Sequence, residues 1–412
     1  AQILLAASVV LLAYLVRGIA GFGSGLIAIP ILALLLPLEI AVPTVVMLDY
    51  MASASHGLTH REAIQWRDLL PLLPFSIVGV LAALYLFKNI EGQLLTTLLG
   101  MFIIVYAIYS LFHHLYGQRE DFKAQIIKLV EVMASRYIER SAELEQRDMA
   151  REQDHNWFLS QEWVGMALYA NAFAKDLKGL KERISYLQDL GVNLLHVMPI
   201  LKCPPDASDG GYAVSDYRAV DQRAGTMEDL HELAQSLRKR DMLLTLDVVV
   251  NHVSNEHEWA QRARNGESHY EDYYYIFGNR DLPDMFEETM PEVFPENAPG
   301  NFTFDETMNK WVMTVFNNFQ WDLNYSNPAV FIEMIDIILF WANQGADIVR
   351  LDAVAFLWKK IGTTCQNERE AHLILQLMKD CCQVTAPGVL FIAEAIVAPV
   401  EITKYFGEDA VI

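Results

Sequence analysis

The stretch ADIVRLDAVAF at 346–356 has the pattern that decides the fold, a short apolar strand whose last residues turn polar. Two further stretches share this pattern, LDVVVNH at 246–252 and VLFIAEA at 389–395. Polar residues at the carboxyl ends of strands are typical of parallel α/β sheets and barrels, which carry their chemistry at that rim. We therefore expect the three segments to be parallel strands that bring their polar ends together.

Strand and helix patterns alternate from about residue 164 onward. Helical patterns occupy 176–191 and 226–241. The expected strands lie near 165–171, 193–198, 242–250, 346–352 and 389–394. Such alternation predicts a parallel sheet with right-handed crossovers. Because the strands end in polar residues on one rim and no G-x-G-x-x-G follows the first strand, the fold class expected is α/β, an incomplete (β/α)8 TIM barrel of about five strands.

The composition divides the chain near residue 117. Residues 1–117 hold 4 Lys/Arg and 5 Asp/Glu, whereas residues 118–412 hold 27 and 47, within a formal net charge of −21. Apolar runs near or above the length of a membrane span occur at about 3–37, 40–55, 69–87 and 94–115. Four runs do not fit a signal peptide. We expect an all-α transmembrane segment that contacts the lipid bilayer through residues 1–115.

Loop charges predict the topology. Arg61 and Arg67 follow the second apolar run, and Arg119 and Lys123 follow the fourth. With four spans both segments lie on one side, which the positive-inside rule makes the cytoplasm. We therefore expect a multi-pass protein of the cell inner membrane whose soluble part is cytoplasmic. The strongly acidic soluble part argues against a nucleic-acid partner.

The cysteines show no metal-ligand spacing, and we interpret them as reduced thiols. They are Cys203, Cys365, Cys381 and Cys382. No calcium-loop spacing is present among the carboxylates, so neither a metal site nor a cofactor is expected. The sequence leaves the oligomeric state open.

Three domains are expected. Residues 1–117 form the transmembrane part, 118–160 a charged helical linker, and 161–412 the barrel domain. A loop as long as 253–330 predicts a small domain inserted over the active site. Its aromatic residues could stack on sugars or form the insert's own core, and both readings stay open. They are Trp259, Tyr273, Tyr274, Trp311 and Trp321.

The strand ends suggest acid–base chemistry. Arg350 and Asp352 alternate onto one face of their strand, and a neighbouring Arg should keep the carboxylate ionised, as a nucleophile requires. Glu394 follows an apolar run, which should raise its pKa toward that of a general acid. Carboxylates on adjacent strands can approach to the about 5–5.5 Å of retaining glycosidases. The alternative is a structural Arg350–Asp352 ion pair with Glu394 capping the following helix.

The apolar first part resembles a known membrane family. GIAGFGSGLIAIPILALLLPLEIAVPTVVMLDYMAS at 18–53 is similar to the opening of the sulfite exporter (TauE/SafE) family of anion permeases. The resemblance covers roughly residues 1–115, about the first half of such a permease. It implies a permease fragment in which Arg17 is either a functional intramembrane charge or a snorkelling side chain.

A second resemblance covers roughly residues 120–412. Its motifs are HNWFLSQEWVG at 155–165, LKCPPDASDGGYAV at 201–214, FNNFQWDLNYSNPAVF at 316–331 and VRLDAVAFLWKKIGTTCQN at 349–367. These segments, with the strand ends above, resemble the α-amylase family of glycoside hydrolases and transglycosidases, and within it the amylosucrases. The implied substrates are sucrose and α-glucan.

The resemblance implies a role for several residues. Asp352 would be the nucleophile that forms a glucosyl-enzyme intermediate, Glu394 the acid/base, and Arg350 the residue that orients the nucleophile. The implied substrate-binding residues are His252, Asp209, Tyr212 and Phe316. Taken alone, Tyr212 and Phe316 fit core packing better. Asp247, inside its strand, fits a structural hydrogen-bonding role.

The resemblance also implies a third catalytic Asp on a later strand, and no matching segment follows Glu394 in these residues. We expect a retaining enzyme active on α-glucosides and resembling amylosucrase, with impaired activity. Two alternatives remain: a membrane anion permease fragment, and a fusion of two partial genes without a joint function.

Overall fold

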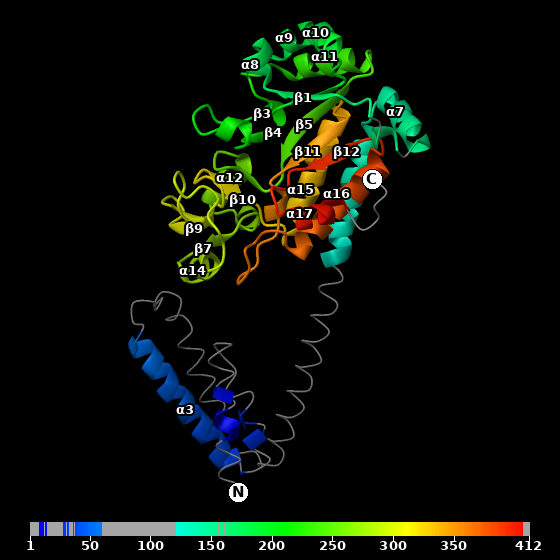
Figure 1. Ribbon diagram of the computed structural model, residues 1–412. Helices are drawn as coiled ribbons and strands as arrows, with labels where there is room; N and C mark the ends of the chain where they lie inside the picture. The colour runs from blue at the N-terminus through cyan, green and yellow to red at the C-terminus, as the bar shows by residue number, and fades with distance from the viewer. Residues whose placement is uncertain are drawn as a thin grey trace. The chain divides into compact units, whose positions relative to one another are not determined.

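The computed structural model describes a defined part of the chain. The described residues are 8–11, 13–14, 28–29, 31–32, 36, 38–59, 121–154, 156–159 and 161–406. The chain divides into two compact units, Ala1–Asp121 and Phe122–Ile412 (Figure 1). Each unit is described by itself below.

The described part of the first unit contains the helix α3 (Leu38–Thr59), which has Pro43 inside it. Small apolar side chains pack together around Leu32 and Val45. The expected span at 40–55 lies within α3, and among the described residues no helix is both long and apolar enough to cross a membrane. The expected runs at 69–87 and 94–115 lie outside the described residues, and the run at 3–37 is described only in part.

The second unit is built on a five-stranded sheet with the order β1-β2-β5-β11-β12. All four neighbouring pairs are parallel. The five expected strands are the five strands of this sheet. Their bounds are β1 (Gly165–Leu168), β2 (Leu194–Val197), β5 (Leu243–Val249), β11 (Ile348–Asp352) and β12 (Leu390–Ala393).

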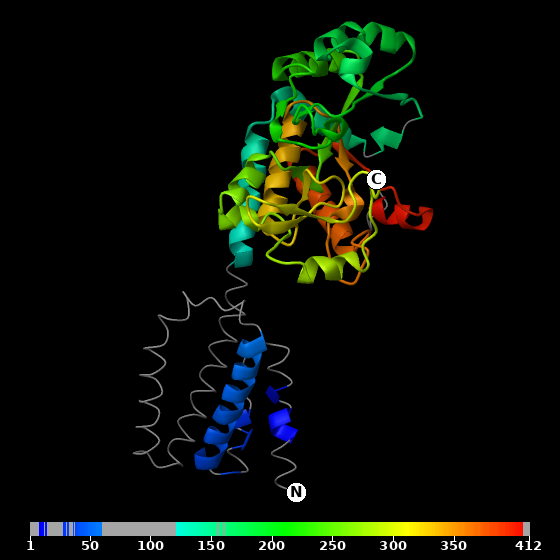
Figure 2. The same cartoon turned by 90° about the vertical axis from the view of Figure 1, so that its left-hand side faces the viewer.

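Helices connect and cover these strands. The expected helix at 226–241 is α11, whose N-terminus is stabilised by a capping box between Thr226 and Asp229. The expected helix at 176–191 is instead two short helices that meet at Arg183. In both views α15 and α16 lie beside β11 and β12 (Figures 1 and 2). The helices are α8 (Ala170–Ala174), α9 (Leu177–Glu182), α10 (Ile184–Asp189), α11 (Met227–Arg238), α15 (Pro328–Asn343), α16 (Arg369–Thr385) and α17 (Pro399–Ile402).

Two small antiparallel ladders and an inserted sheet interrupt the alternation. The strand β6 (His252–Ser254) pairs antiparallel with β10 (Gln320–Asp322), and β3 (Leu201–Lys202) pairs with β4 (Asp216–Val220). Between β6 and β10 a three-stranded sheet has the order β7-β9-β8. Its strands and the neighbouring helices are α12 (Glu258–Arg264), α13 (Ser268–Glu271), β7 (Ile276–Phe277), α14 (Asp281–Glu287), β8 (Phe302–Asp305) and β9 (Lys310–Met313).

The aromatic residues of the insert pack inward. Trp259, Tyr273, Tyr274 and Trp321 are buried within the main core, with at most 7% of each residue exposed. Trp311 packs against a second apolar cluster around Phe302. Of the two readings left open, the structure favours a core role for these side chains over sugar stacking.

The expected linker is helical and packs on the barrel end opposite the polar rim. Residues 121–138 are helical, and α7 (Ala142–Gln153) follows. Arg140 and Asp148 form an almost fully buried ion pair at 2.5 Å. Arg151 donates to Asp347 at 2.9 Å and to the Gly388 carbonyl at 2.7 Å, and these two residues lie just before β11 and β12. The linker thereby fixes the amino ends of both strands.

Candidate active site

Arg350 joins three carboxylates from three adjacent parallel strands. From the middle of β11, its Nη1 donates to Asp352 Oδ1 at 3.1 Å and to Asp247 Oδ1 on β5. Its Nη2 lies 2.7 Å from Glu394 Oε1, which directly follows β12. The Asp247 side chain has no exposed surface. One guanidinium therefore sets the positions of both carboxyl groups that the sequence predicted to be catalytic.

The pKa of Asp352 is raised above its ordinary range. Burial is the largest cause, followed by the hydrogen bond and the charge of Glu394, while Arg350 acts in the opposite direction. The prediction that Arg350 keeps Asp352 ionised was wrong for this geometry, because Asp352 is only 7% exposed and faces a second carboxyl group. Burial and the facing carboxyl group therefore favour the protonated form of Asp352.

A sharp turn after β11 brings the backbone to Glu394. Ala353 has φ = 55°, a left-handed conformation uncommon for a residue with a side chain. Its N–H donates to Glu394 Oε2 at 3.2 Å. Because Arg350 holds the other oxygen, both oxygens of Glu394 accept from β11 or the turn after it. Glu394 does not cap the next helix, since the N-cap of α17 is Ala398.

His196 extends the charged network below the rim. Its Nε2 lies 2.7 Å from Asp247 Oδ2. Asp247 thus contacts His196 on β2 and Arg350 on β11, the two strands that flank its own. The side chain acts as a buried hydrogen-bond acceptor, which agrees with the structural role predicted for it.

A glycine turn presents Asp209 and Tyr212. Asp209, Gly210 and Gly211 have φ values of 48°, 66° and 105°. A Cβ at Gly211 would lie 2.8 Å from the Cβ of Pro199, so this position requires glycine. Tyr212 ends the turn, and its hydroxyl accepts from Arg350 Nη1 at 3.4 Å. The turn therefore brings Tyr212 to the carboxylate cluster and Asp209 to Gln320, which donates to it at 3.0 Å.

His252 and Phe316 form the neighbouring wall. The His252 ring lies 4.9 Å from that of Phe316, which in turn lies 5.0 Å from Phe356. Burial lowers the pKa of His252 to about 4, so the imidazole is neutral near pH 7. Gln320, from β10, donates to both His252 and Asp209 at 3.0 Å. The wall is therefore apolar on the Phe316 side and hydrogen-bonding on the His252 side.

A buried lysine lies behind this wall. Lys359 Nζ is 2.6 Å from Asp322 Oδ2 and 3.0 Å from Asn251 Oδ1, and it also donates to the Phe356 carbonyl at 2.5 Å. Asn251 Nδ2 in turn donates to Asp322 at 3.0 Å. Neither Lys359 nor Asp322 has any exposed side-chain surface. This cluster ties the insert's last strand to the turn after β11.

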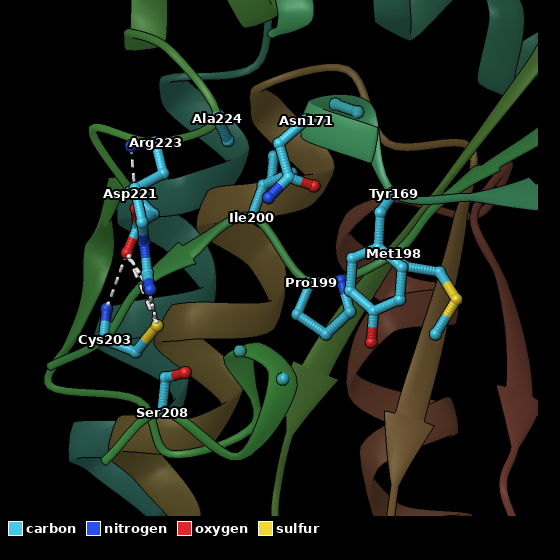
Figure 3. A pocket seen from close by; sticks show the side chains of 13 residues that line it. Tyr169, Asn171, Met198, Pro199, Ile200, Cys203, Ser208, Asp221, Arg223 and Ala224 are labelled. Carbon is cyan, nitrogen blue, oxygen red and sulfur yellow. Dashed lines mark hydrogen bonds and ion pairs between the residues drawn. The ribbon is translucent and has the colours of Figure 1, made fainter. Parts of the chain in front are cut away.

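A cavity of about 210 Å³ lies beside the glycine turn (Figure 3). Gly210 and Gly211 form part of its wall, together with Tyr169 and Pro199. On the far side Arg223 donates to Asp221 and to the Cys203 sulfur, each at 2.8 Å. The cavity contains none of the predicted catalytic residues.

The structure brings all seven predicted site residues into one connected cluster. Tyr212 and Phe316 are half-buried, and each also packs against an apolar cluster on one side. Sequence reasoning did not single out His196, Gln320 or Lys359. His196 is a polar residue near the end of the apolar segment LLHV, and this position could have marked it as a candidate site residue. Gln320 lies inside the FNNFQWDLNYSN motif but was not predicted as a site residue. No feature of the neighbouring sequence distinguishes Lys359.

Comparison with known families agrees with this arrangement. The family model described as "Alpha amylase, catalytic domain" matches residues 147–411. The chain belongs to this family. The model "Sulfite exporter TauE/SafE" matches residues 6–143.

Curated relatives in the alpha-amylase family include several enzymes. The trehalose synthase/amylase TreS of Mycolicibacterium smegmatis is 35% identical over 261 residues, which are 62% of this chain and 43% of the relative. The glucosylglycerate phosphorylase of Spirochaeta thermophila is 38% identical over 217 residues, 52% of this chain and 34% of the relative. The chain therefore spans less than half the length of these relatives.

Solved structures show the same fold. The trehalulose synthase MutB from Pseudomonas mesoacidophila MX-45 superposes with a TM-score of 0.51 at 28% identity, over 57% of this chain and 44% of MutB. A MutB mutant in complex with the substrate sucrose gives a TM-score of 0.55 at 28% identity, over 61% and 47%. The five-stranded sheet thus belongs to an alpha-amylase-type (β/α)8 barrel.

Proposed function

We propose that the second unit carries the nucleophile, the acid/base and the glucosyl subsite of a retaining enzyme active on α-glucosides. The observation that carries this proposal is the contact of one guanidinium, Arg350, with both Asp352 and Glu394 at the ends of adjacent parallel strands. This places two carboxyl groups at the barrel rim with a hydrogen bond between them.

The reaction proposed has two steps. Asp352 attacks the anomeric carbon of the glucosyl donor while Glu394 gives its proton to the oxygen of the leaving group. An acceptor hydroxyl then attacks the glucosyl-enzyme, and Glu394 takes up the acceptor's proton. The first step requires an ionised Asp352 and a proton on Glu394, and Arg350 favours the ionised form of Asp352.

The finer proposal is an amylosucrase-like reaction, glucosyl transfer from sucrose to an α-glucan or to water. It is supported by the motifs around Asp209, Phe316 and Asp352 that resemble amylosucrases. A solved relative that binds sucrose supports the substrate class. Asp209 and His252 offer a carboxylate and an imidazole to glucosyl hydroxyls, and Tyr212 offers an aromatic face.

Sucrose turnover by the purified full-length chain tests the proposal. We expect the parent to release fructose, and Asp352→Asn to lower the rate by at least about 10³-fold. Asp380→Asn, an exposed carboxylate on α16, is the matched control and should leave the rate unchanged. Mass spectrometry of Glu394→Gln mixed with sucrose should find one glucosyl unit bound to the peptide that contains Asp352. Equal fructose release from the parent and Asp352→Asn would rule the proposal out.

We propose further that the first unit is a TauE/SafE-like membrane part that places the barrel at the cytoplasmic face of the inner membrane. The family match over residues 6–143 supports this proposal. After an alkaline carbonate wash the full chain should stay with the membranes, and its release would contradict the proposal. Uptake of sulfite by vesicles containing the chain tests whether this part transports anions.

A further inference from the structure

Gln320 lies where the inserted segment returns to the barrel. It is the first residue of β10, and it has no exposed surface. Its Nε2 donates to Asp209 Oδ2 and to His252 Nε2, each at 3.0 Å. Gln320 thus connects two residues that come from different barrel loops and that both face the proposed glucosyl subsite.

The other end of the amide fixes its orientation. Gln320 Oε1 accepts from the Asn317 backbone N–H at 3.1 Å and from Asn317 Nδ2 at 2.8 Å. With two donors at the oxygen and two acceptors at the nitrogen, every hydrogen-bonding position of the amide is in use. A flipped amide would turn its oxygen toward the Asp209 carboxylate, so only one orientation satisfies all four contacts.

Amide groups contact both ring nitrogens of His252. Gln320 Nε2 lies 3.0 Å from His252 Nε2, and Asn251 Nδ2 lies 3.2 Å from His252 Nδ1. Burial lowers the pKa of His252 to about 4, so the ring is neutral near pH 7. The two amides therefore fix the position of the imidazole ring from both sides.

Asp209 needs an external support. It lies in an exposed turn in which three consecutive residues have positive φ values. Among the described residues Gln320 is the one hydrogen-bond partner found for its carboxylate, and that bond uses Oδ2. The contact leaves Oδ1 of Asp209 for a ligand hydroxyl.

We propose that Gln320 is a positioning residue that sets the spacing between Asp209 and His252, and with it the selectivity of the subsite among hexoses. This inference rests on the proposed function. A pyranose that offers hydroxyls at that spacing binds both groups, whereas an epimer with one hydroxyl inverted meets only one of them.

Gln320→Glu tests the proposal because it conserves volume and replaces the donor to Asp209 and His252 with a carboxylate oxygen. The new carboxylate faces Asp209 instead of donating to it. We expect the Kd for glucose to rise about 10- to 100-fold at pH 7.5, the cost of losing the charge-assisted hydrogen bond to Asp209 and the neutral one to His252. Binding should recover toward pH 5 as the new carboxyl is protonated. A role in packing alone would give no such pH dependence.

Gln344→Glu is the matched control. Gln344 also hydrogen-bonds a histidine Nε2, that of His231 at 2.5 Å, but this pair is exposed and remote from the site. Asn317→Ala is a second variant that removes one support of the amide without touching Asp209 or His252. We expect the control to bind glucose like the parent, and Asn317→Ala to weaken binding about threefold to tenfold.

Isothermal titration of the full chain with glucose, galactose and mannose gives the readout. If Gln320→Glu and Asn317→Ala bind glucose as the parent does, or keep its ratio of glucose to galactose affinity, the positioning role is wrong. If the parent binds no hexose and releases no fructose from sucrose, the proposed function itself fails. Unfolding monitored by tryptophan fluorescence shows whether Gln320→Glu folds. If it does not fold, the glucose affinity of Asn317→Ala tests the positioning role.

Discussion

Lys359 and Asp322 form an ion pair from which water is excluded, with Nζ 2.6 Å from Oδ2 and no exposed surface on either side chain. Asn251 and the Phe356 carbonyl supply the remaining oxygen partners of the ammonium. A buried pair of this kind costs a large desolvation free energy that only complete pairing offsets. Its value to the fold therefore depends on both partners being present.

Lys359→Met should lower the free energy of unfolding of the full chain by about 3–5 kcal/mol, because it leaves the Asp322 carboxylate buried without a cation. Urea unfolding followed by tryptophan fluorescence measures the change. Lys310→Met is the matched control. Its partner Glu271 is also 2.6 Å away, but the two side chains are 34% and 26% exposed. The control should cost no more than about 1 kcal/mol, and equal losses in the two variants would contradict the prediction.

Asp352→Asn should stabilise the fold while it removes activity. The folded state raises the pKa of Asp352, so above the ordinary Asp range ionisation favours the unfolded chain. Asparagine removes this cost, and we expect a gain of at least about 1 kcal/mol at pH 7.5. The gain should shrink toward pH 4, where the carboxyl is protonated in both states. Urea unfolding at the two pH values checks this, and a variant less stable than the parent at pH 7.5 would count against it.

Arg350→Lys should fold but lose at least about 10²-fold in kcat/KM for sucrose. An ammonium is a point charge and cannot hold Asp247, Asp352 and Glu394 in the fixed geometry of a guanidinium. Arg240→Lys, at an exposed arginine, is the control and should leave the rate as in the parent. A loss below threefold in Arg350→Lys would show that the carboxylates hold their positions without the guanidinium.

The two buried histidines should lower the stability of the second unit between pH 7 and pH 4, against the opposite contribution of Asp352. Burial lowers the pKa of His257 to about 4, as it does for His252. The unfolded chain takes up protons near pH 6.5 while the folded chain does not, so each histidine removes about 3 kcal/mol as the pH falls through this window. His257→Gln should remove about half of this contribution, measured as the difference between unfolding free energies at pH 7 and pH 4. His269→Gln, at an exposed position, should leave the difference as in the parent.

The strands and the carboxylate pair could be predicted because their signals are local. An apolar segment that ends in a polar residue marks a barrel strand, and parallel strands place such ends on one rim. This reasoning placed Asp352 and Glu394 next to each other correctly. It failed on the ionisation of Asp352, because burial and the facing carboxyl group depend on how the strands pack.

The polar residues that support the site could not be found in this way. Gln320 acts through Asp209 and His252, and Lys359 acts through Asp322 and Asn251. In each case the contacts span many positions of the chain and depend on where the insert returns to the barrel. No short pattern in the sequence encodes such a return.

The pairing of β6 with β10 has a consequence for the order in which the chain gains structure. His252 and Gln320 are 68 positions apart, so their contact closes a long loop and costs conformational entropy. This loop must close before the proposed subsite can bind a sugar. On the ribosome, β1, β2 and β5 emerge well before Gln320 does. The nascent barrel therefore has strands and part of its core before the contact between His252 and Gln320, and with it the proposed hexose selectivity, can form.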